Sequence, residues 1–567
     1  MIYKPITEQW PIMLAYITLI GGTSLLRNPM PRLFIIFFQA YVLATMVYWT
    51  GKRCVKAFAY LVIYLLFTIE IGLEKLFGMY ISPATLMLLV ETNMRESTEF
   101  MRVLLAKPEI KGLTMGFALI VMANFLVERY RLTINHHLAK HREFIKTGRY
   151  TTLILIFSGF VFHAEYITLF SCDEVNDVDE WRSHMRNPND ILTKTIISLW
   201  VLHLSEKEMV NVIIKTESMK SEVQIKNNDS LVVVFVIGES YIRNHSALYG
   251  YPLQTTPFLS HEQENGQLFV FSDVVSPYNQ TTKVIRNTLS CNSIGEGERW
   301  TSTPPLTAIF KKNGYHVSFF DNQKDFCFGT LFLFSLNTYL YHPKMLKECY
   351  DETNDTTFEF DGQLVDYFFN NYEKRKQNQL VVFHLLGQHF VFKDRYPKDF
   401  KYYNVDSTAF RNDTWLTKQM REEIANYDNA TRYNDKVLKK IMDYYRNDNM
   451  VLIYFSDHGE EVYDYRASIG RDAFEYGDNF KEGLHWQYDV PFMVWCSRKY
   501  MTLYPENIRA LRIARERPLS LDNTCHLLFH LSGLNTSYYK TSRDILSKDY
   551  AQPLRLINDK IDYDKYK

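Results

Sequence analysis

Acidic residues and a histidine follow two apolar runs of the sequence. The run LVVVFVIG, which begins at Leu231, stops at Glu239, and the run VLIYFS stops at Asp457 and His458. Runs of β-branched and aromatic residues are typical of buried parallel strands, and ligands of open α/β sheets collect where such strands end. Carboxylate oxygen and imidazole nitrogen together suit zinc or manganese. The two strand ends therefore predict one metal site assembled from distant parts of the chain.

Each of these residues also has an ordinary alternative. Glu239 could cap the following helix or form an ion pair with it, and Asp457 and His458 could belong to a solvated turn whose bend Gly459 permits. The fully apolar strand directly before the second motif favours a site over a turn.

Two adjacent threonines, Thr281 and Thr282, precede a helical pattern in SPYNQTTKVIRNTLS. Ser and Thr are favoured helix N-caps, and capping is the safer interpretation from spacing alone. A hydroxyl at that place could equally be a nucleophile, because a helix N-terminus stabilises an attached phosphate.

Two further histidines lie beside predicted strand ends. His389 follows strand 379–386 in LLGQHF, and His485 precedes strand 491–495 in EGLHWQYDVPF. Either could be an ordinary hydrogen-bonded histidine, but their positions favour a shared cleft. His384 falls inside its strand and is expected to be a core residue.

The elements that must position these residues alternate after residue 229. Strands are predicted at 231–237, 315–320, 379–386, 450–456 and 491–495, with helices between them at 281–290, 303–313, 361–376 and 421–445. This alternation predicts an α/β domain with a mostly parallel, doubly wound sheet that helices cover on both faces.

The first part of the chain is strongly apolar. Five segments, roughly 9–26, 31–50, 55–79, 111–128 and 150–170, have the length that a helix needs to cross a bilayer. Lysines and arginines cluster in the loops after the second and fourth segments, which marks those loops as cytoplasmic. We therefore expect a multi-pass membrane domain at 1–170, an amphipathic linker at 171–228 and an extracytoplasmic domain at 229–567.

Charge and cysteine content set further limits. The 567 residues include 64 basic and 64 acidic side chains, so no overall field indicates a nucleic-acid partner. Six of the seven cysteines lie beyond residue 170, on the side where disulfides persist, but their spacing does not define a pairing.

The motifs as a set resemble the phosphoethanolamine transferases of Gram-negative bacteria, which are membrane members of the alkaline phosphatase and sulfatase superfamily. The matching stretches run in family order over about 231–495: IGESYIRNHSALYGYPLQTTP, SPYNQTTKVIRNTLS, LLGQHFVFKDRYP, NYDNATRYNDKVL, YFSDHGEE and EGLHWQYDVP. The resemblance implies an alkaline-phosphatase-like catalytic domain in the periplasm, anchored in the inner membrane by about five helices.

The resemblance also implies residue roles. Glu239, Thr281, Asp457 and His458 match the family's zinc ligands, with one or two Zn²⁺ expected and Thr281 as the nucleophile. His389 and His485 match histidines that bind a second metal or the substrate phosphate. Residues expected to contact substrate are Thr92 and Glu96 in the loop before the fourth apolar segment, and Lys324 in FFDNQKDF.

The implied reaction has two displacements. Thr281 attacks phosphatidylethanolamine and releases diacylglycerol, and an acceptor then attacks the resulting phosphoethanolamine ester. His389 or His485 would protonate a leaving oxygen. The acceptor would be lipid A, lipopolysaccharide core or another envelope glycan. Pro277 and Asn287 stand where the lipid A enzymes have a cysteine pair, and Leu88 and Ser240 replace an Asn and a Thr found in other members. These departures look more like the branch that acts on lipopolysaccharide core or other glycans.

Alternative functions use the same cleft. A membrane-bound metal-dependent phosphodiesterase or phosphatase, or a phosphoglycerol transferase, would need the same ligands. A sulfatase activity is less expected, because the sequence contains no Cys-x-Pro-x-Arg or Ser-x-Pro-x-Arg stretch for making formylglycine. A membrane-anchored binding protein with a decayed site is disfavoured, because all the expected ligands are present.

Overall fold

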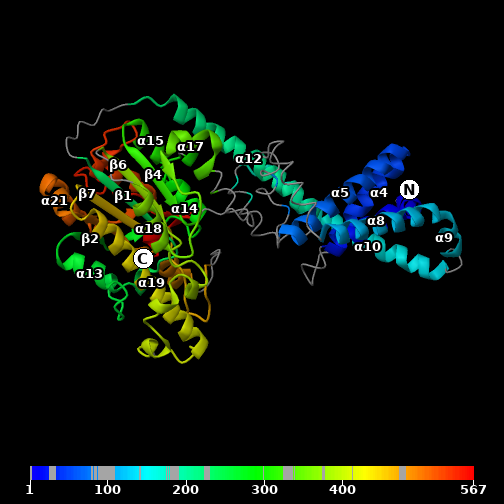
Figure 1. Ribbon diagram of the computed structural model, residues 1–567. Coiled ribbons are helices and arrows are strands. Elements are labelled where there is room, and N and C mark those ends of the chain that lie inside the picture. The colour runs from blue at the N-terminus through cyan, green and yellow to red at the C-terminus, as the bar shows by residue number, and fades with distance from the viewer. Residues whose placement is uncertain are drawn as a thin grey trace. The chain divides into compact units, whose positions relative to one another are not determined.

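The computed structural model (Figure 1) describes most of the chain, and the fold and site below refer to these residues. They are 3–23, 33–77, 81, 86, 109–138, 142–173, 175, 178, 191–221, 230–297, 299–323, 336, 339–372, 377–411, 413–471 and 480–566. Two compact units divide the chain, the first ending at Lys207 and the second beginning at Glu208. This boundary falls inside one long helix, α12 (Ile191–Ser218).

A seven-stranded mixed sheet forms the centre of the second unit, in the order β2-β8-β7-β1-β6-β4-β5. Its strands are β1 (Val232–Gly238), β2 (Leu268–Phe271), β4 (His316–Asp321), β5 (Glu352–Thr353), β6 (Gln379–His384), β7 (Met450–Ser456) and β8 (Phe492–Cys496). Strands β7, β1, β6, β4 and β5 run parallel, whereas β8 is antiparallel to both β7 and β2. The parallel strands therefore all end at one edge of the sheet.

Alternate residues of the central strand face two separate cores. Val233, Phe235 and Ile237 of β1 belong to one apolar cluster, and the intervening Val232 and Val234 belong to the other. The helices of the first face include α14 (Thr281–Thr288), α15 (Leu306–Lys312), α17 (Pro343–Cys349) and α23 (Thr524–Ser532). The helices of the second face include α18 (Asp361–Asn371) and α19 (Lys418–Tyr445) (Figure 1). This period-two burial makes both faces apolar, as a doubly wound sheet requires.

The predicted α/β domain is confirmed, and all five predicted strands and four predicted helices are present, each end within five residues of its expected position. The sheet is less uniformly parallel than the alternation suggested. Strand β8 was predicted, but a local run of apolar residues carries no information about strand direction. The short strands β2 and β5 were not predicted.

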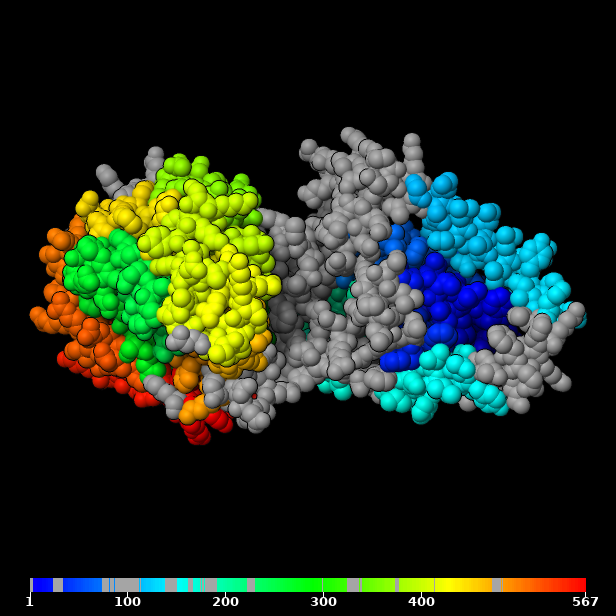
Figure 2. All heavy atoms as spheres, turned by 90° about the horizontal axis from the view of Figure 1, so that it is seen from below, coloured from blue at the N-terminus to red at the C-terminus, as the bar shows by residue number. Residues whose placement is uncertain are grey.

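Helix α19 also supports the segment that precedes β2. The buried carboxylate of Asp435 accepts hydrogen bonds from the backbone N–H groups of Phe258 and Leu259, each at 3.0 Å. These residues begin α13 (Pro257–Glu264), and Figure 2 shows the two helices side by side, α13 in green and α19 in yellow. The remaining helices of this unit are α20 (Phe480–Gln487), α21 (Arg498–Leu503) and α22 (Pro505–Ala514).

The first unit is helical in its described residues. Its helices are α1 (Tyr3–Glu8), α2 (Trp10–Tyr16), the π-helix η1 (Ile17–Gly21), α4 (Leu33–Thr50), α5 (Arg53–Phe77), α8 (Glu109–Arg129), α9 (Arg131–Leu138) and α10 (Arg142–Ile167). The described residues of each of the five apolar segments predicted from the sequence are largely helical. Within the predicted linker at 171–228, residues 191–218 form the helix α12.

One helix meets the length and composition that a membrane span needs. Among the described residues, Arg53–Leu73 is long and apolar enough to cross a membrane, and Trp10–Gly21, Phe34–Thr50 and Tyr150–Val161 are shorter apolar helices. Large apolar side chains on this unit are exposed, including Met46, Phe58, Phe125 and Phe157 at 59 to 68%. The number of spans stays a prediction.

A buried histidine in the second unit lies between two carboxylates. His245 Nδ1 is 2.8 Å from Asp428 and its Nε2 is 2.9 Å from Asp464. Tyr251 donates a hydrogen bond to Asp428, and Arg411 lies 3.3 Å from Asp464. Burial lowers the pKa of His245, but the Asp464 and Asp428 carboxylates prevail and raise the pKa to about 9. The folded protein therefore holds an imidazolium that bridges two aspartates.

This cluster should make stability depend on pH. Because the pKa of His245 in the folded protein lies above its ordinary value, protonated His245 adds to the free energy of unfolding. This contribution is complete below about pH 6.5 and disappears as pH rises through 9. Its size is on the order of 3 kcal/mol. We expect the unfolding temperatures of wild type and His245→Gln to differ most at pH 6 and to converge toward pH 10. Tyrosines titrate at high pH in both proteins alike, so their titration does not account for the convergence. A constant difference would contradict the ion-pair account.

Candidate metal centre

The two predicted strand ends lie side by side in the sheet. Strands β1 and β7 pair in parallel register, with Gly238 opposite Ser456, so that Glu239 and Asp457 leave the sheet at the same level. The Asp457 N–H donates to the Gly238 carbonyl at 3.1 Å, which joins the two turns. The chain then turns through Ser240, whose φ of 56° lies in the left-handed region. A non-glycine residue in that region is a strained feature that is concentrated at functional sites.

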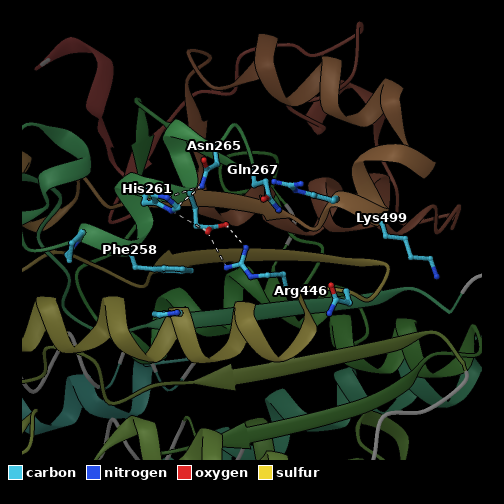
Figure 3. Close-up of a pocket in the computed structure, with 11 residues that line it drawn as sticks. Phe258, His261, Asn265, Gln267, Arg446 and Lys499 are labelled. Atoms are coloured by element: carbon cyan, nitrogen blue, oxygen red, sulfur yellow. Dashed lines mark hydrogen bonds and ion pairs between the residues drawn. The ribbon is translucent and has the colours of Figure 1, made fainter.

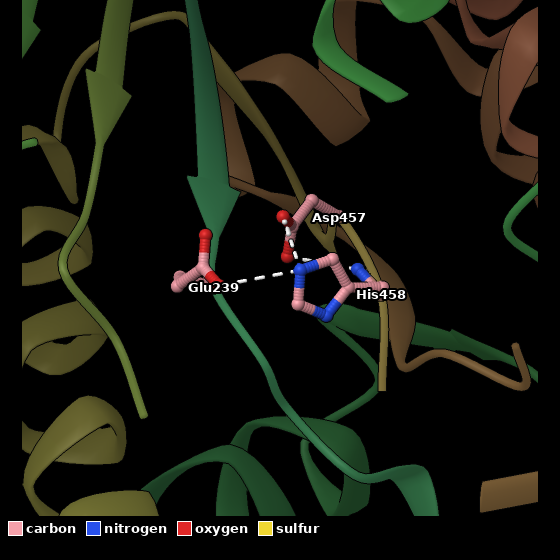
Figure 4. A group of neighbouring side chains, drawn as sticks. All are labelled: Glu239, Asp457 and His458. Carbon is pink, nitrogen blue, oxygen red and sulfur yellow. Dashed lines mark hydrogen bonds and ion pairs between the residues drawn. The ribbon is translucent and has the colours of Figure 1, made fainter. Parts of the chain in front are cut away.

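Glu239, Asp457 and His458 form a buried cluster with metal-ligand geometry. One ligand atom from each lies within 4.8 Å of the others. Figure 4 shows the three side chains turned toward one another. His458 Nε2 is 3.3 Å from Glu239 Oε1 and 3.0 Å from Asp457 Oδ2. All three side chains are inaccessible to solvent. Two carboxylates and one imidazole converging on a buried point suit a divalent cation.

The hydrogen bonds of Asp457 leave one of its oxygens for such a cation. Asp457 Oδ1 accepts hydrogen bonds from the backbone N–H of Ser240 at 3.1 Å and of His458 at 2.8 Å. Asp457 Oδ2 is buried and, within the part of the chain that the structure describes, accepts no hydrogen bond. A buried carboxylate oxygen without a donor is costly unless a cation serves it. The donor set therefore fits a metal ion.

The surroundings of His458 fix which ring nitrogen faces the cluster. Nδ1 lies 2.8 Å from the Gly459 carbonyl oxygen, so Nδ1 carries the proton when the ring is neutral and Nε2 carries the lone pair. Burial raises the pKa of Glu239, but the imidazoles of His458 and His389 and the Arg471 guanidinium prevail and hold the pKa below its ordinary value. The charged carboxylate is the form that binds a metal.

The Thr281 hydroxyl lies against this cluster. Its Oγ1 donates to Glu239 Oε2 at 3.1 Å and lies 3.2 Å from His458 Nε2. Thr281 is the first residue of α14, and the residue before it, Gln280, makes no side-chain cap. The structure thus brings together Glu239, Thr281, Asp457 and His458, and it places the hydroxyl where the helix N-terminus favours a negative charge.

Two residues that sequence reasoning missed also contact the cluster. Gln323 donates from Nε2 to Glu239 Oε2 at 3.1 Å, and Arg471 N–H contacts His458 Nε2. The signal for Gln323 was available, because it belongs to the polar run that follows β4. Arg471 lies in the loop after Gly459 with no periodic pattern around it, so no sequence signal distinguished it.

The two histidines predicted beside strand ends have different surroundings. His389 is exposed and lies one residue beyond Gln388, whose backbone N–H donates to the Glu239 carbonyl at 3.0 Å. His485 is in α20, with Nδ1 at 3.2 Å from Asp489 and 3.3 Å from the Tyr563 hydroxyl. Among the described residues, neither histidine forms a hydrogen bond or ion pair with the three-residue cluster, although the His389 imidazole lowers the pKa of Glu239.

Other predicted residues are accounted for as follows. His384 is buried in β6 with Nδ1 at 2.9 Å from Asp321, which confirms a core position. Thr92, Glu96 and Lys324 lie outside the described residues. Five cysteines in the described residues are free thiols, namely Cys54, Cys291, Cys349, Cys496 and Cys525.

The glycine of the DHG motif is required by a close approach. A Cβ at Gly459 would lie 2.0 Å from the Trp486 carbonyl oxygen, and the Gly459 N–H donates to the Gln487 carbonyl at 2.8 Å. The predicted role of Gly459 in permitting a bend is thus replaced by a steric one, since its φ is not in the left-handed region.

Gly459→Ala should therefore displace the turn that carries Asp457 and His458. We expect a loss of about 3 kcal/mol or more in stability, together with weaker metal binding, measured by thermal unfolding and by titration with Zn²⁺. Gly72→Ala in α5 is the matched control, because a Cβ there meets no atom within 4 Å. Equal behaviour of the two variants would contradict the close-approach argument.

A pocket lies at the end of the sheet opposite to the Glu239, Asp457 and His458 cluster (Figure 3). It has a volume of about 940 Å³, and residues flanking the start of β2 and the end of β8, Gln267 and Arg498, line it. Its Arg446 is paired with the buried Glu262 at 3.1 Å. The pocket contains none of the predicted site residues and is separate from the metal centre.

Comparison with known proteins decides the family. A family model described as Sulfatase matches residues 232–533, more than half of the chain. The chain belongs to the sulfatase family. The match covers the strands that carry Glu239 and Asp457, and it includes Thr281 and His485.

Relatives within this family are more specific. The chain is 29% identical over 350 residues to "Phosphoethanolamine transferase EptC" of Escherichia coli O18:K1:H7, a match that covers 59% of this chain and 58% of that protein. The crystal structure of the C-terminal periplasmic domain of EcEptC from Escherichia coli is 28% identical, with a TM-score of 0.51, and covers 60% of this chain and 95% of that one. Its complex with Zn is 27% identical with a TM-score of 0.50, over 60% of this chain and 95% of that one.

Proposed function

We propose that this protein transfers phosphoethanolamine from phosphatidylethanolamine to lipid A, lipopolysaccharide core or another envelope glycan. The observation that carries the proposal is the Thr281 hydroxyl, 3.1 Å from Glu239 and 3.2 Å from His458 at the N-terminus of α14. A hydroxyl between metal ligands and a helix N-terminus has what a phosphoryl-accepting nucleophile needs. The named activity of the relative supplies the group transferred.

We further propose zinc as the metal, with one or two ions bound. Glu239, Thr281, Asp457 and His458 would hold the first ion, and the zinc complex of the similar periplasmic domain supports this choice. When bound, zinc lowers the hydroxyl pKa of its ligand and screens the charge of an incoming phosphate.

The chain's own residues then account for the proton and bond changes. Glu239 accepts the hydrogen bond of Thr281, so the hydroxyl proton faces a carboxylate as the Thr281 Oγ1–P bond forms and the bond from phosphorus to the glycerol oxygen breaks. His389 or His485 protonates the leaving diacylglycerol oxygen. An acceptor oxygen then attacks the same phosphorus, and the Thr281 oxygen leaves and regains a proton.

The remainder of the chain suits a lipid donor. Exposed apolar side chains on the helices of the first unit, such as Phe125 and Phe157, fit contact with acyl chains. We propose a multi-pass inner-membrane domain at 1–170, a linker at 171–228 and a periplasmic catalytic domain at 229–567. Thr92, Glu96 and Lys324 are proposed to contact the lipid head group or the transferred phosphate.

Product analysis tests this function. The purified full chain with zinc and head-group-labelled phosphatidylethanolamine should release diacylglycerol and place the label on an added glycolipid acceptor. A hydrolase would release free phosphoethanolamine or ethanolamine instead, and a phosphoglycerol transferase would require phosphatidylglycerol. Mass spectrometry of envelope lipids from cells with and without the gene would identify the acceptor by a gain of one phosphoethanolamine group.

A further inference from the structure

The positively charged side chain of Arg471 contacts the three-residue cluster at His458. Its Nη1 donates to the Asn279 carbonyl oxygen at 2.8 Å and also contacts His458 Nε2. Its Nε lies 3.5 Å from the buried carboxylate of Glu460. The side chain retains 27% of its exposure, so the guanidinium is held at the site while remaining accessible to a ligand.

The position of Arg471 relative to the nucleophile favours an anion. Asn279 precedes Thr281 by two residues, so the guanidinium is anchored directly before α14. The N-terminus of a helix favours an anion through its dipole and its first-turn N–H groups, and Gln280 makes no side-chain cap there. A guanidinium offers a planar set of donors that match phosphate oxygens. Two independent features that favour a phosphate therefore flank the Thr281 hydroxyl.

The contact with His458 has a second consequence. In the neutral ring of His458, Nδ1 faces the Gly459 carbonyl and carries the proton, so the lone pair is on Nε2. That lone pair can serve a guanidinium N–H or a metal ion, but not both. Metal binding at the cluster and the contact between Arg471 and His458 are thus mutually exclusive.

We propose that Arg471 binds the oxygens of the phosphoryl group being transferred, and that it must leave His458 when the metal binds there. This inference rests on the proposed function and adds a substrate-binding residue to it. The released guanidinium keeps its anchor at the Asn279 carbonyl, so it stays beside the nucleophile. In this account Arg471 opposes metal binding and favours transfer.

Arg471→Gln tests both parts, because they move in opposite directions. We expect zinc affinity of the full chain, measured by competition with a chromogenic chelator, to rise several-fold in the variant. We expect kcat/KM for transfer to fall by about 100-fold or more. Arg509→Gln is the control, since Arg509 is exposed and pairs only with the exposed Glu506 among the described residues. Arg471→Lys should recover part of the loss, because it retains charge but not the planar donors.

Parallel losses of zinc affinity and transfer in Arg471→Gln would overturn the inference, since they would show a structural role. An unchanged rate of transfer would also overturn it. Binding of soluble phosphoethanolamine to the zinc-loaded full chain separates this inference from the proposed function. If wild type binds it and Arg471→Gln does not, Arg471 is a phosphate-binding residue even when no lipid product forms. If both bind it equally, the inference fails whatever the transfer assay shows.

Discussion

Thr281→Ala is expected to lower the rate of phosphoethanolamine transfer by more than about 10⁴-fold, because the variant lacks the oxygen that forms the covalent bond. The side chain contributes little else to folding, since it is the partly exposed first residue of α14. Expression and thermal stability should therefore stay close to wild type. The measurement is release of labelled diacylglycerol from phosphatidylethanolamine by the purified full chain.

Thr281→Ser provides the matched control for this prediction. It keeps a hydroxyl at the same distance from Glu239 and His458, so measurable transfer should remain. A Thr281→Ala protein that transfers within about tenfold of the wild-type rate would exclude Thr281 as the nucleophile, because catalysis without the covalent step is far slower.

Asp457→Asn is expected to weaken zinc binding by more than about 100-fold and to reduce transfer in proportion. The substitution keeps Oδ1 as acceptor for the Ser240 and His458 N–H groups but replaces the negative oxygen Oδ2 with a neutral amide. Residues that only orient a metal ligand typically change metal affinity by roughly 10- to 100-fold when they are substituted. Loss of a ligand to the metal itself should lower the affinity by more than this. Equilibrium dialysis with Zn²⁺ and the transfer assay, each over a range of zinc concentrations, measure the two effects.

Asp435→Asn is the matched control for Asp457→Asn. Asp435 of α19 is also buried and also accepts two backbone N–H groups, one on each carboxylate oxygen, from Phe258 and Leu259 at the start of α13. It does not belong to the three-residue cluster. It should leave zinc affinity unchanged. Zinc binding that survives Asp457→Asn, or that falls equally in both variants, would contradict the assignment of the metal centre.

The convergence of Glu239, Asp457 and His458 could be predicted from the sequence, because these residues follow long apolar strands. Glu239 and Asp457 stand directly after β1 and β7, and parallel pairing of those strands places the two ends together. Thr281 could be predicted only as a helix N-cap or a nucleophile, since its distance to Glu239 depends on how the first face of the sheet packs.

Other parts of the site had weaker signals or none. The direction of β8 depends on the long-range connection before it and cannot be read from its apolar residues. Arg471 follows a polar loop without periodicity. It contacts His458 and also Asn279, and the second contact joins residues 192 positions apart in the sequence. His485 was predicted beside a strand end, but its pairing with Asp489 and Tyr563 depends on the position of the C-terminal segment.

The central claim is that three distant stretches of the chain hold a metal ion against the Thr281 oxygen, and that this oxygen becomes phosphorylated. It is tested most directly by acid quenching of the zinc-loaded full chain during reaction with phosphatidylethanolamine, followed by peptide mass spectrometry. The account predicts one phosphoethanolamine group attached to Thr281, dependent on zinc and absent from Asp457→Asn. A modified residue other than Thr281, or turnover with no covalent adduct at any time, would contradict it.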